Sequence, residues 1–350
     1  MKILILKPSS LGDVVQALPV ARLLRLRFPG ATLHWWVNAD LAPLLEGDPD
    51  IARIVPFERR RWANPESIGR GVTALRRLRA ERYEWVLDLQ GLARSATLAW
   101  LVRGRLTVGL QDWREGAPAL YDVSVPRPSP ATHAVDWYLA VLRALEVPVD
   151  RPYEWLPLRP AAAAAVAARS DAPETLWIAL QPGARWTNKR WPVERFAETA
   201  QRLLSGNPQC RIAVLGGSAD RPLGAAIAAA GGSRVLDLSG RLTLPEMVEW
   251  IRRCAVLVTN DTGPMHVAAA LGRPVVGIFG PTDPRRTGPY GQTDRILRVP
   301  MPCAPCLKPA CHLAEPLACL TRISVEAVVG AVTARLSSPV PAPCPDPSAP

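Results

Sequence analysis

The feature that most constrains the fold is a unit that recurs along the chain: a short apolar run, a loop of small and polar residues, and a longer helical pattern. Lys2–Lys7 is such a run, followed by the loop Ser9–Asp13 (SSLGD) and by helical periodicity over Val14–Phe28. Continuous apolar strands that alternate with helices are typical of parallel sheets with right-handed crossovers. The sequence therefore predicts an α/β fold.

The alternation occurs in two stretches separated by a change of character at residues 151–160, where prolines recur without clear periodicity. We expect an N-terminal domain over residues 1–150, a linker over 151–160 and a C-terminal domain over 161–338, whose last helix can pack back on the first domain. Residues 339–350 are rich in proline and are predicted to be a disordered tail. Two such sheets place a ligand cleft at the carboxyl ends of their strands.

Net charge and hydropathy narrow the classes of partner that the protein can bind. The net charge of +11, from 42 Lys and Arg against 31 Asp and Glu, favours an anionic partner. No nucleic-acid-binding motif or basic stripe with interleaved aromatics is present, so nucleic acid is not expected. No apolar run approaches the roughly 18 residues that cross a bilayer, and the start does not resemble a secretory signal. We therefore expect a cytoplasmic protein.

The loop after the first apolar run carries the first candidate site, with Ser10, Gly12 and Asp13. One interpretation is a helix start, with Ser10 as N-cap and Asp13 three residues later against the helix dipole. The other makes Asp13 a general base that takes a proton from an attacking sugar hydroxyl. Gly12 would let an acceptor approach the backbone closely.

The segment Asn260–His266 follows a second apolar run and carries Asp261, Thr262, Gly263 and His266. Backbone N–H groups at the start of the following helix are expected to bind phosphate. The alternative is an ordinary helix cap formed by Asp261 or Thr262. His266 equally fits a packed core histidine.

Two further loops suit a nucleotide diphosphate. In Gln181–Pro192, Gly183 and Lys189 offer backbone amides and then a cation, although a solvated basic loop is the alternative. In Gly216–Asp220, Gly217 allows close approach and Asp220 can accept from ribose hydroxyls, but the spacing is not that of G-x-G-x-x-G.

Four of the seven cysteines lie close together: Cys303, Cys306, Cys311 and Cys319, with His312 among them. The grouping suggests metal ligands, yet the spacing matches no standard zinc or iron–sulfur pattern. A reduced structural loop is the other interpretation, since a disulfide framework is not expected in the cytoplasm.

Taken together, these motifs resemble glycosyltransferase family 9, the heptosyltransferases of lipopolysaccharide core synthesis, over about residues 1–336. The resemblance rests on K-x-S-S-x-G-D from Lys7, D-x-Q-G-L from Asp88, K-x-W-P from Lys189, N-D-T-G-x-x-H from Asn260 and G-P-T-D-P from Gly280. It implies the GT-B fold, two Rossmann-like domains with parallel sheets that face each other across a cleft. It also implies an inverting mechanism that requires no metal or other cofactor.

By this resemblance, Asp13 is the catalytic base and an ADP-heptose donor is a substrate. The implied donor contacts are Gly183, Lys189, Gly217, Asp220, Asp261, Thr262, Gly263 and His266. The implied contacts to an anionic, lipid-linked Kdo or heptose acceptor are Ser10, Gly12, Arg60, Arg61 and Arg114. The expected location is the cytoplasmic face of the inner membrane. Another nucleotide-sugar donor, a nucleotide-sugar epimerase and a non-catalytic nucleotide- or metal-binding protein remain alternatives.

Overall fold

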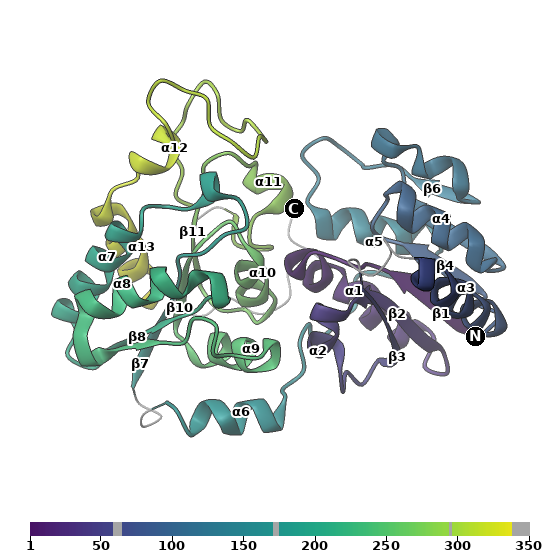
Figure 1. Cartoon of the computed structure of the whole chain (residues 1–350), viewed down its shortest axis with the longest axis horizontal. Coiled ribbons are helices and arrows are strands. Elements are labelled where there is room, and N and C mark those ends of the chain that lie inside the picture. Colours follow the sequence, from purple (N-terminus) through teal and green to yellow (C-terminus); the bar gives the residue numbers. More distant parts are fainter. Residues whose placement is uncertain (59–64, 171–174, 294–295, 338–350) are drawn as a thin grey trace. The chain divides into compact units, whose positions relative to one another are not determined.

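The computed structural model describes residues 1–58, 65–170, 175–293 and 296–337 (Figure 1). The chain divides into two compact units, Met1–Trp155 and Leu156–Pro350. Each unit has its own parallel sheet with helices on it. Within the described ranges, no helix is both long enough and apolar enough to cross a membrane.

The N-terminal unit is built on a six-stranded parallel sheet. Its strands are β1 (Lys2–Leu6), β2 (Thr32–Asn38), β3 (Ile51–Phe57), β4 (Trp85–Asp88), β5 (Leu106–Leu110) and β6 (Val123–Val125). Their order across the sheet is β3-β2-β1-β4-β5-β6, and every pairing is parallel. The direction of winding reverses between β1 and β4. The loops after these two strands therefore meet at the carboxyl edge, where doubly wound sheets bind ligands.

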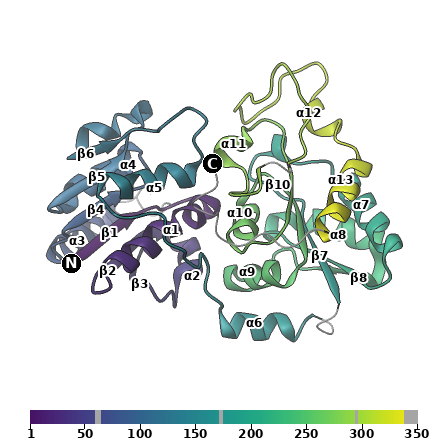
Figure 2. The same ribbon diagram turned by 180° about the vertical axis from the view of Figure 1, so that it is seen from behind.

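Helices cover both faces of this sheet. They are α1 (Leu11–Arg27), α2 (Ala42–Leu45), α3 (Pro65–Ala80), α4 (Ala93–Val102) and α5 (Ala134–Ala144), with short 3₁₀ segments η1 (Ala39–Leu41), η3 (Trp113–Glu115) and η4 (Ala117–Leu120). Leu4 of β1 belongs to a buried cluster with Leu78 of α3 and Ala99 of α4. Lys7, whose side chain points to the opposite face, stands over the ring of Tyr138 in α5. Helix α5 packs beside α1 (Figure 2).

The C-terminal unit has a five-stranded parallel sheet. Its strands are β7 (Leu176–Gln181), β8 (Cys210–Val214), β9 (Val235–Asp237), β10 (Val256–Asn260) and β11 (Val275–Ile278). The order β11-β10-β7-β8-β9 reverses between β7 and β10. The loops after β7 and β10 therefore lie side by side, and they are two of the three loops in which the sequence predicts donor contacts.

The helices of the C-terminal unit are α6 (Pro160–Ala167), η5 (Thr187–Lys189), α7 (Val193–Gly206), η6 (Ser218–Asp220), α8 (Arg221–Gly231), η7 (Gly232–Arg234), α9 (Leu244–Arg253), α10 (Gly263–Ala270), α11 (Pro284–Thr287), α12 (Ala318–Thr321) and α13 (Val325–Leu336). Trp191 and Phe196 meet edge to face, with ring centroids 5.1 Å apart. They belong to the core cluster that also buries Val328 and Val332 of α13, which packs on α7. The last helix is thus part of the core of this unit.

Several element boundaries differ from the sequence-based expectation. Helix α1 begins at Leu11, so Asp13 lies inside its first turn and not in the preceding loop. Strands β5 and β6 and helix α5 were not predicted; β6 has only three residues, too few to show a periodicity. The expected tail 339–350 lies outside the described residues.

Arg22 of α1 is 5% exposed and joins three segments of the N-terminal unit. Its guanidinium donates to both oxygens of Asp48, each at 2.6 Å, and to Asp50 at 2.7 Å. A further bond of 3.0 Å reaches the carbonyl oxygen of Trp155, the last residue of the unit. Arg22 therefore holds the end of the N-terminal unit to helix α1.

We expect Arg22→Leu to lower the free energy of unfolding by about 3–5 kcal/mol, because it leaves the buried Asp48 without its counter-charge. Urea titration followed by tryptophan fluorescence measures the change. Arg27→Leu, an exposed position on the same helix, is the control and should stay within about 0.5 kcal/mol of wild type. A loss below about 1 kcal/mol for Arg22→Leu would show that the pair is not structurally important.

Candidate functional site

An ion pair connects the two loops that meet at the switch point of the C-terminal sheet. Lys189, at the end of η5, places its Nζ 2.6 Å from Oδ2 of Asp261, the residue that follows β10. The same oxygen accepts a 2.7 Å hydrogen bond from Oγ1 of Thr282, in the loop after β11. Asp261 is buried, and only 18% of the Lys189 side chain is exposed. The carboxylate therefore fixes an ammonium group at the carboxyl edge of the sheet.

Asn260 holds the loop that carries Lys189. Its Nδ2 donates to the carbonyl of Pro182 at 2.7 Å, and its Oδ1 accepts from the backbone N–H of Trp191 at 3.0 Å. One buried amide thus closes both ends of the loop between β7 and α7. Neither Asn260 nor Thr282 was assigned a role by sequence reasoning, although each lies within a motif that it singled out.

The first turn of α10 follows directly. Thr262 is the N-cap with extended backbone, and its side chain makes no capping bond. Pro264 has no N–H, and the N–H of Met265 donates to the carbonyl of Thr262 at 3.1 Å, so the donors at the positive end of the helix dipole are the N–H groups of Thr262 and Gly263. His266 is buried in the same helix. This arrangement places backbone donors beside Asp261, as expected for an anion site.

A glycine-lined recess surrounds Asp220. The Oδ2 of Asp220 accepts from the backbone N–H of Gly217 at 3.0 Å. A Cβ atom on Gly183 would lie 2.3 Å from this carboxylate, and one on Gly216 would lie 2.8 Å from the Asp220 Cβ. The loops after β7 and β8 therefore approach each other only because both lack side chains. The structure brings Gly183 to the loop that carries Gly217 and Asp220, which the distance between the two motifs in the sequence did not reveal.

Asp13 lies at the carboxyl edge of the N-terminal sheet. Its Oδ2 accepts from the backbone N–H of Ser10 at 2.8 Å and from Oγ of Ser10 at 2.6 Å. Gly12 beside it is buried. The carboxylate therefore has the capping geometry that was one of the two interpretations. Asp13 is half-buried, and its role as a general base stays a prediction.

Lys7 supplies a buried positive charge behind Asp13. It follows β1, is 3% exposed, and donates from Nζ to the carbonyl of Leu89 at 2.8 Å. Burial opposes its charge, but attraction to Tyr138 and to the carboxylates of Asp13 and Asp88 raises the pKa of Lys7 above its ordinary value. The sequence analysis assigned no role to Lys7, which entered only as the first residue of the K-x-S-S-x-G-D motif.

Asp88 shapes the loop after β4. Its Oδ1 accepts from the backbone N–H groups of Gln90 and Gly91, and its Oδ2 accepts from the hydroxyl of Tyr121 at 2.7 Å. Burial raises the pKa of this carboxyl even though these bonds oppose the shift. Asp88 therefore positions the loop backbone at the switch point of the first sheet.

The expected acceptor arginines divide into two groups. Arg60 and Arg61 lie outside the described residues. Arg114 lies in η3 with 75% of its side chain exposed, and its guanidinium binds Asp112, with the closest contact at 2.6 Å. Hydrogen bonding to Asp112 raises the pKa of Arg114. A ligand that binds Arg114 must therefore compete with, or share, this carboxylate.

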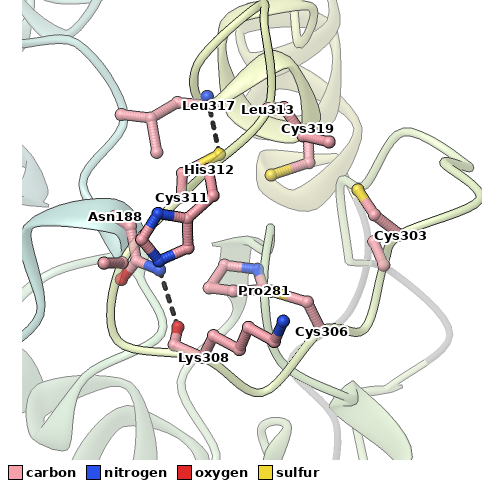
Figure 3. Close-up of a pocket in the computed structure, with 12 residues that line it drawn as sticks. Asn188, Pro281, Cys303, Cys306, Lys308, Cys311, His312, Leu313, Leu317 and Cys319 are labelled. Atoms are coloured by element: carbon pink, nitrogen blue, oxygen red, sulfur yellow. Dashed lines mark hydrogen bonds between the residues drawn. The ribbon is translucent and has the colours of Figure 1, made fainter.

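The four cysteines line one pocket together with His312 (Figure 3). Its volume is about 130 Å³, and its wall includes Asn188, whose Nδ2 donates to the carbonyl of Lys308 at 2.7 Å. The pocket therefore adjoins the loop that carries Lys189. In the described part of the chain, no three His, Cys, Asp or Glu side chains are arranged to hold a metal ion. The candidate ligands Cys303, Cys306, Cys311 and Cys319 share a pocket without forming such a set.

Known structures share this architecture. The E. coli ADP-heptose lipopolysaccharide heptosyltransferase II is 27% identical, with a TM-score of 0.78 over 96% of this chain and 98% of that one. The E. coli heptosyltransferase WaaC with ADP-2-deoxy-2-fluoro heptose is 25% identical, with a TM-score of 0.75 over 95% and 99% of the two chains. The fold is thus that of GT-B glycosyltransferases, as the sequence predicted.

Sequence comparison gives the family. The model of "Glycosyltransferase family 9 (heptosyltransferase)" matches residues 72–316. Lipopolysaccharide heptosyltransferase 1 of Pseudomonas aeruginosa is 30% identical over 97% of this chain and 99% of its own length. The chain belongs to glycosyltransferase family 9. This confirms the expected family and the assignment as a glycosyltransferase.

The pocket thiols should differ in reactivity. The backbone N–H of Leu317 donates to Sγ of Cys311 at 3.4 Å, and such bonds lower the pKa of Cys311, whereas burial raises the pKa of Cys319. Because the thiolate is the reactive form, iodoacetamide should modify Cys311 at lower pH than Cys319. Mass spectrometry of peptides after timed labelling over a pH series measures this order. The reverse order would contradict the assignment, and Cys254, fully buried, serves as the unreactive control.

Proposed function

We propose that this protein transfers an L-glycero-D-manno-heptosyl unit from ADP-heptose to a Kdo or heptose residue of the lipopolysaccharide inner core. The observation that carries the proposal is the Lys189–Asp261–Thr282 network beside the first turn of α10. A fixed ammonium group beside the backbone N–H donors of Thr262 and Gly263 suits a nucleotide diphosphate. The names of the relatives supply the identity of the sugar.

The donor would lie along the carboxyl edge of the C-terminal sheet. Its diphosphate would bind Lys189 and the N–H groups of Thr262 and Gly263, with His266 close by in the same helix. Asp220 can accept from the ribose hydroxyls, and Gly183 and Gly217 leave room for the nucleotide to approach the backbone. Lys189 supplies a cation beside the leaving group, so we propose that catalysis needs no metal or other cofactor.

The reaction would be a single displacement with inversion. Asp13 takes the proton from the attacking acceptor hydroxyl while the bond between the anomeric carbon and the diphosphate oxygen breaks. The leaving ADP carries the electron pair of that bond, and Lys189 with the α10 N-terminus stabilises the charge that develops on it. Lys7 supplies a buried positive charge near the proposed base.

The acceptor would be an anionic, lipid-linked sugar bound by the N-terminal unit, through Ser10, Gly12, Arg114 and the undescribed Arg60 and Arg61. We propose that the protein acts at the cytoplasmic face of the inner membrane as a peripheral protein. The relatives include heptosyltransferases I and II, so both a Kdo and a heptosylated acceptor belong in the first assay.

The direct test is acceptor-dependent release of ADP from ADP-heptose, with Kdo₂-lipid A and its monoheptosylated form as acceptors. Release with one acceptor, undiminished by EDTA, supports the proposed reaction and identifies the step. If another nucleotide-sugar is consumed and ADP-heptose is not, the donor assignment is wrong.

Asp13→Asn should lower kcat roughly 100-fold, as expected for a lost general base. The matched control is Glu246→Gln in α9. There Thr243 donates to Glu246 from its backbone N–H and hydroxyl at 2.8 and 2.9 Å, as Ser10 does to Asp13. If Asp13 were only a cap, both variants would lose a little stability and keep wild-type kcat.

Lys189→Met should lower kcat/KM for the donor roughly 10- to 100-fold, the loss of one charge-assisted hydrogen bond. Asp261→Asn should also lower it, because the carboxylate holds the ammonium group. Combining the two should cost no more than Lys189→Met alone. Additive losses in this double-mutant cycle would show that Asp261 acts independently of Lys189. The control is Lys308→Met, at an exposed lysine of the same unit.

A further inference from the structure

Arginine is the dominant charged residue of helices α3 and α4. Helix α3 also contains Glu66, and the carboxylate of Glu115 accepts from the backbone N–H of Ala93 at 2.9 Å, at the start of α4. Residues 67–80 and 92–110, which include most of α3 and all of α4, contain arginines but no aspartate or glutamate. Glu81, which follows α3 directly, is paired with Lys2 and Arg53 at 2.7 Å each. Over most of their length, these helices therefore carry no acidic residue of their own.

The outward side chains form what we call the basic face: Arg76 and Arg77 of α3, Arg94 and Trp100 of α4, and its C-cap Arg103. All five are exposed, and Trp100 is 56% exposed. Among the residues that the structure describes, none of the four arginines is found in an ion pair or side-chain hydrogen bond. Trp100 adds one large aromatic side chain to this charged surface.

The two helices form one continuous surface. They cover the same face of the sheet, where Leu78 of α3 and Ala99 of α4 share a buried cluster. Nε of Arg79 donates to the carbonyl of Leu101 at 2.6 Å and ties α3 to the end of α4. Figure 1 shows α3 and α4 beside each other on this unit. The basic face thus spans two helices that cannot easily separate.

We propose that the basic face docks on an anionic lipid bilayer. Arginines near a negatively charged membrane surface are each attracted to it, and tryptophan partitions to the headgroup region. Charge complementarity selects the occupant, because four unpaired guanidinium groups with one aromatic side chain fit a layer of phosphate headgroups. The inference rests on the proposed function, since a lipid-linked acceptor is presented at such a surface.

Vesicle co-sedimentation tests the basic face directly, with the full-length protein. Vesicles of phosphatidylethanolamine and phosphatidylglycerol are compared with vesicles of phosphatidylcholine. We expect binding to the anionic vesicles only, weakened by salt. Arg76→Gln/Arg77→Gln should lower the partition coefficient roughly 30-fold, and Trp100→Ser should lower it without changing the net charge.

The matched control is Arg27→Gln/Arg143→Gln, two exposed arginines on α1 and α5, which cover the opposite face of the same sheet. It removes the same net charge and should bind vesicles as wild type does. Equal losses in both double variants would show a general charge effect and overturn the proposal. Equal binding to phosphatidylcholine vesicles would also overturn the proposal. Binding to native membranes alone, lost after those membranes are treated with protease, would overturn it too and would assign the basic face to a protein partner.

Activity separates this inference from the proposed function. Arg76→Gln/Arg77→Gln should keep wild-type transfer to an acyl-free acceptor in solution and lose transfer to the same sugar embedded in anionic vesicles. If wild type transfers heptose but does not bind anionic vesicles, the docking proposal fails alone. If it binds vesicles through the basic face but neither acceptor supports the release of ADP, the proposed function fails and the docking surface stands.

Discussion

The ion pair between Lys189 and Asp261 is the constraint on which the candidate donor site depends. It joins the loops after β7 and β10, which neighbour each other only because the strand order reverses there. Asn260 closes the first of these loops at both ends, and Thr282 brings in the loop after β11. Three loops are thereby held around one carboxylate. The network leaves the ammonium group at a defined position before any ligand arrives, which is the condition for electrostatic stabilisation of a leaving group.

The N-terminal unit uses the same principle with different chemistry. There the reversal lies between β1 and β4, and Lys7 bridges the two strands through the carbonyl of Leu89. Its charge is buried behind Asp13, whose carboxylate is oriented by Ser10. A cap and a base need not exclude each other, since the bonds that cap the helix also orient the carboxylate. In both units, a buried or half-buried lysine stands at the point where the winding of the sheet reverses.

The fold class and the loops of the site were predictable because they depend on local patterns. Apolar runs ended by Gly-rich or Asp-rich loops indicate where strands of a parallel sheet finish, and this placed Asp13, Lys189 and Asp261 at carboxyl edges. The partners of these residues could not be predicted. Thr282 meets Asp261, and Asp220 meets Gly183, only through the order of the strands, which no local pattern encodes. Short elements such as β6 also carried too few residues to show a periodicity.

The recess around Asp220 has a consequence for how such enzymes can diverge. A side chain at position 183 would collide with the carboxylate of Asp220, so neither position can vary while the other keeps its present conformation. The two residues come from different loops and share no hydrogen bond in the structure as described. Their dependence is purely one of occupied space. A lineage that acquires a larger residue in the first loop must therefore move or replace the acidic residue of the second, and with it change the shape of the recess. Under the proposed function, changes in donor preference would then arise as coupled substitutions and not as single steps.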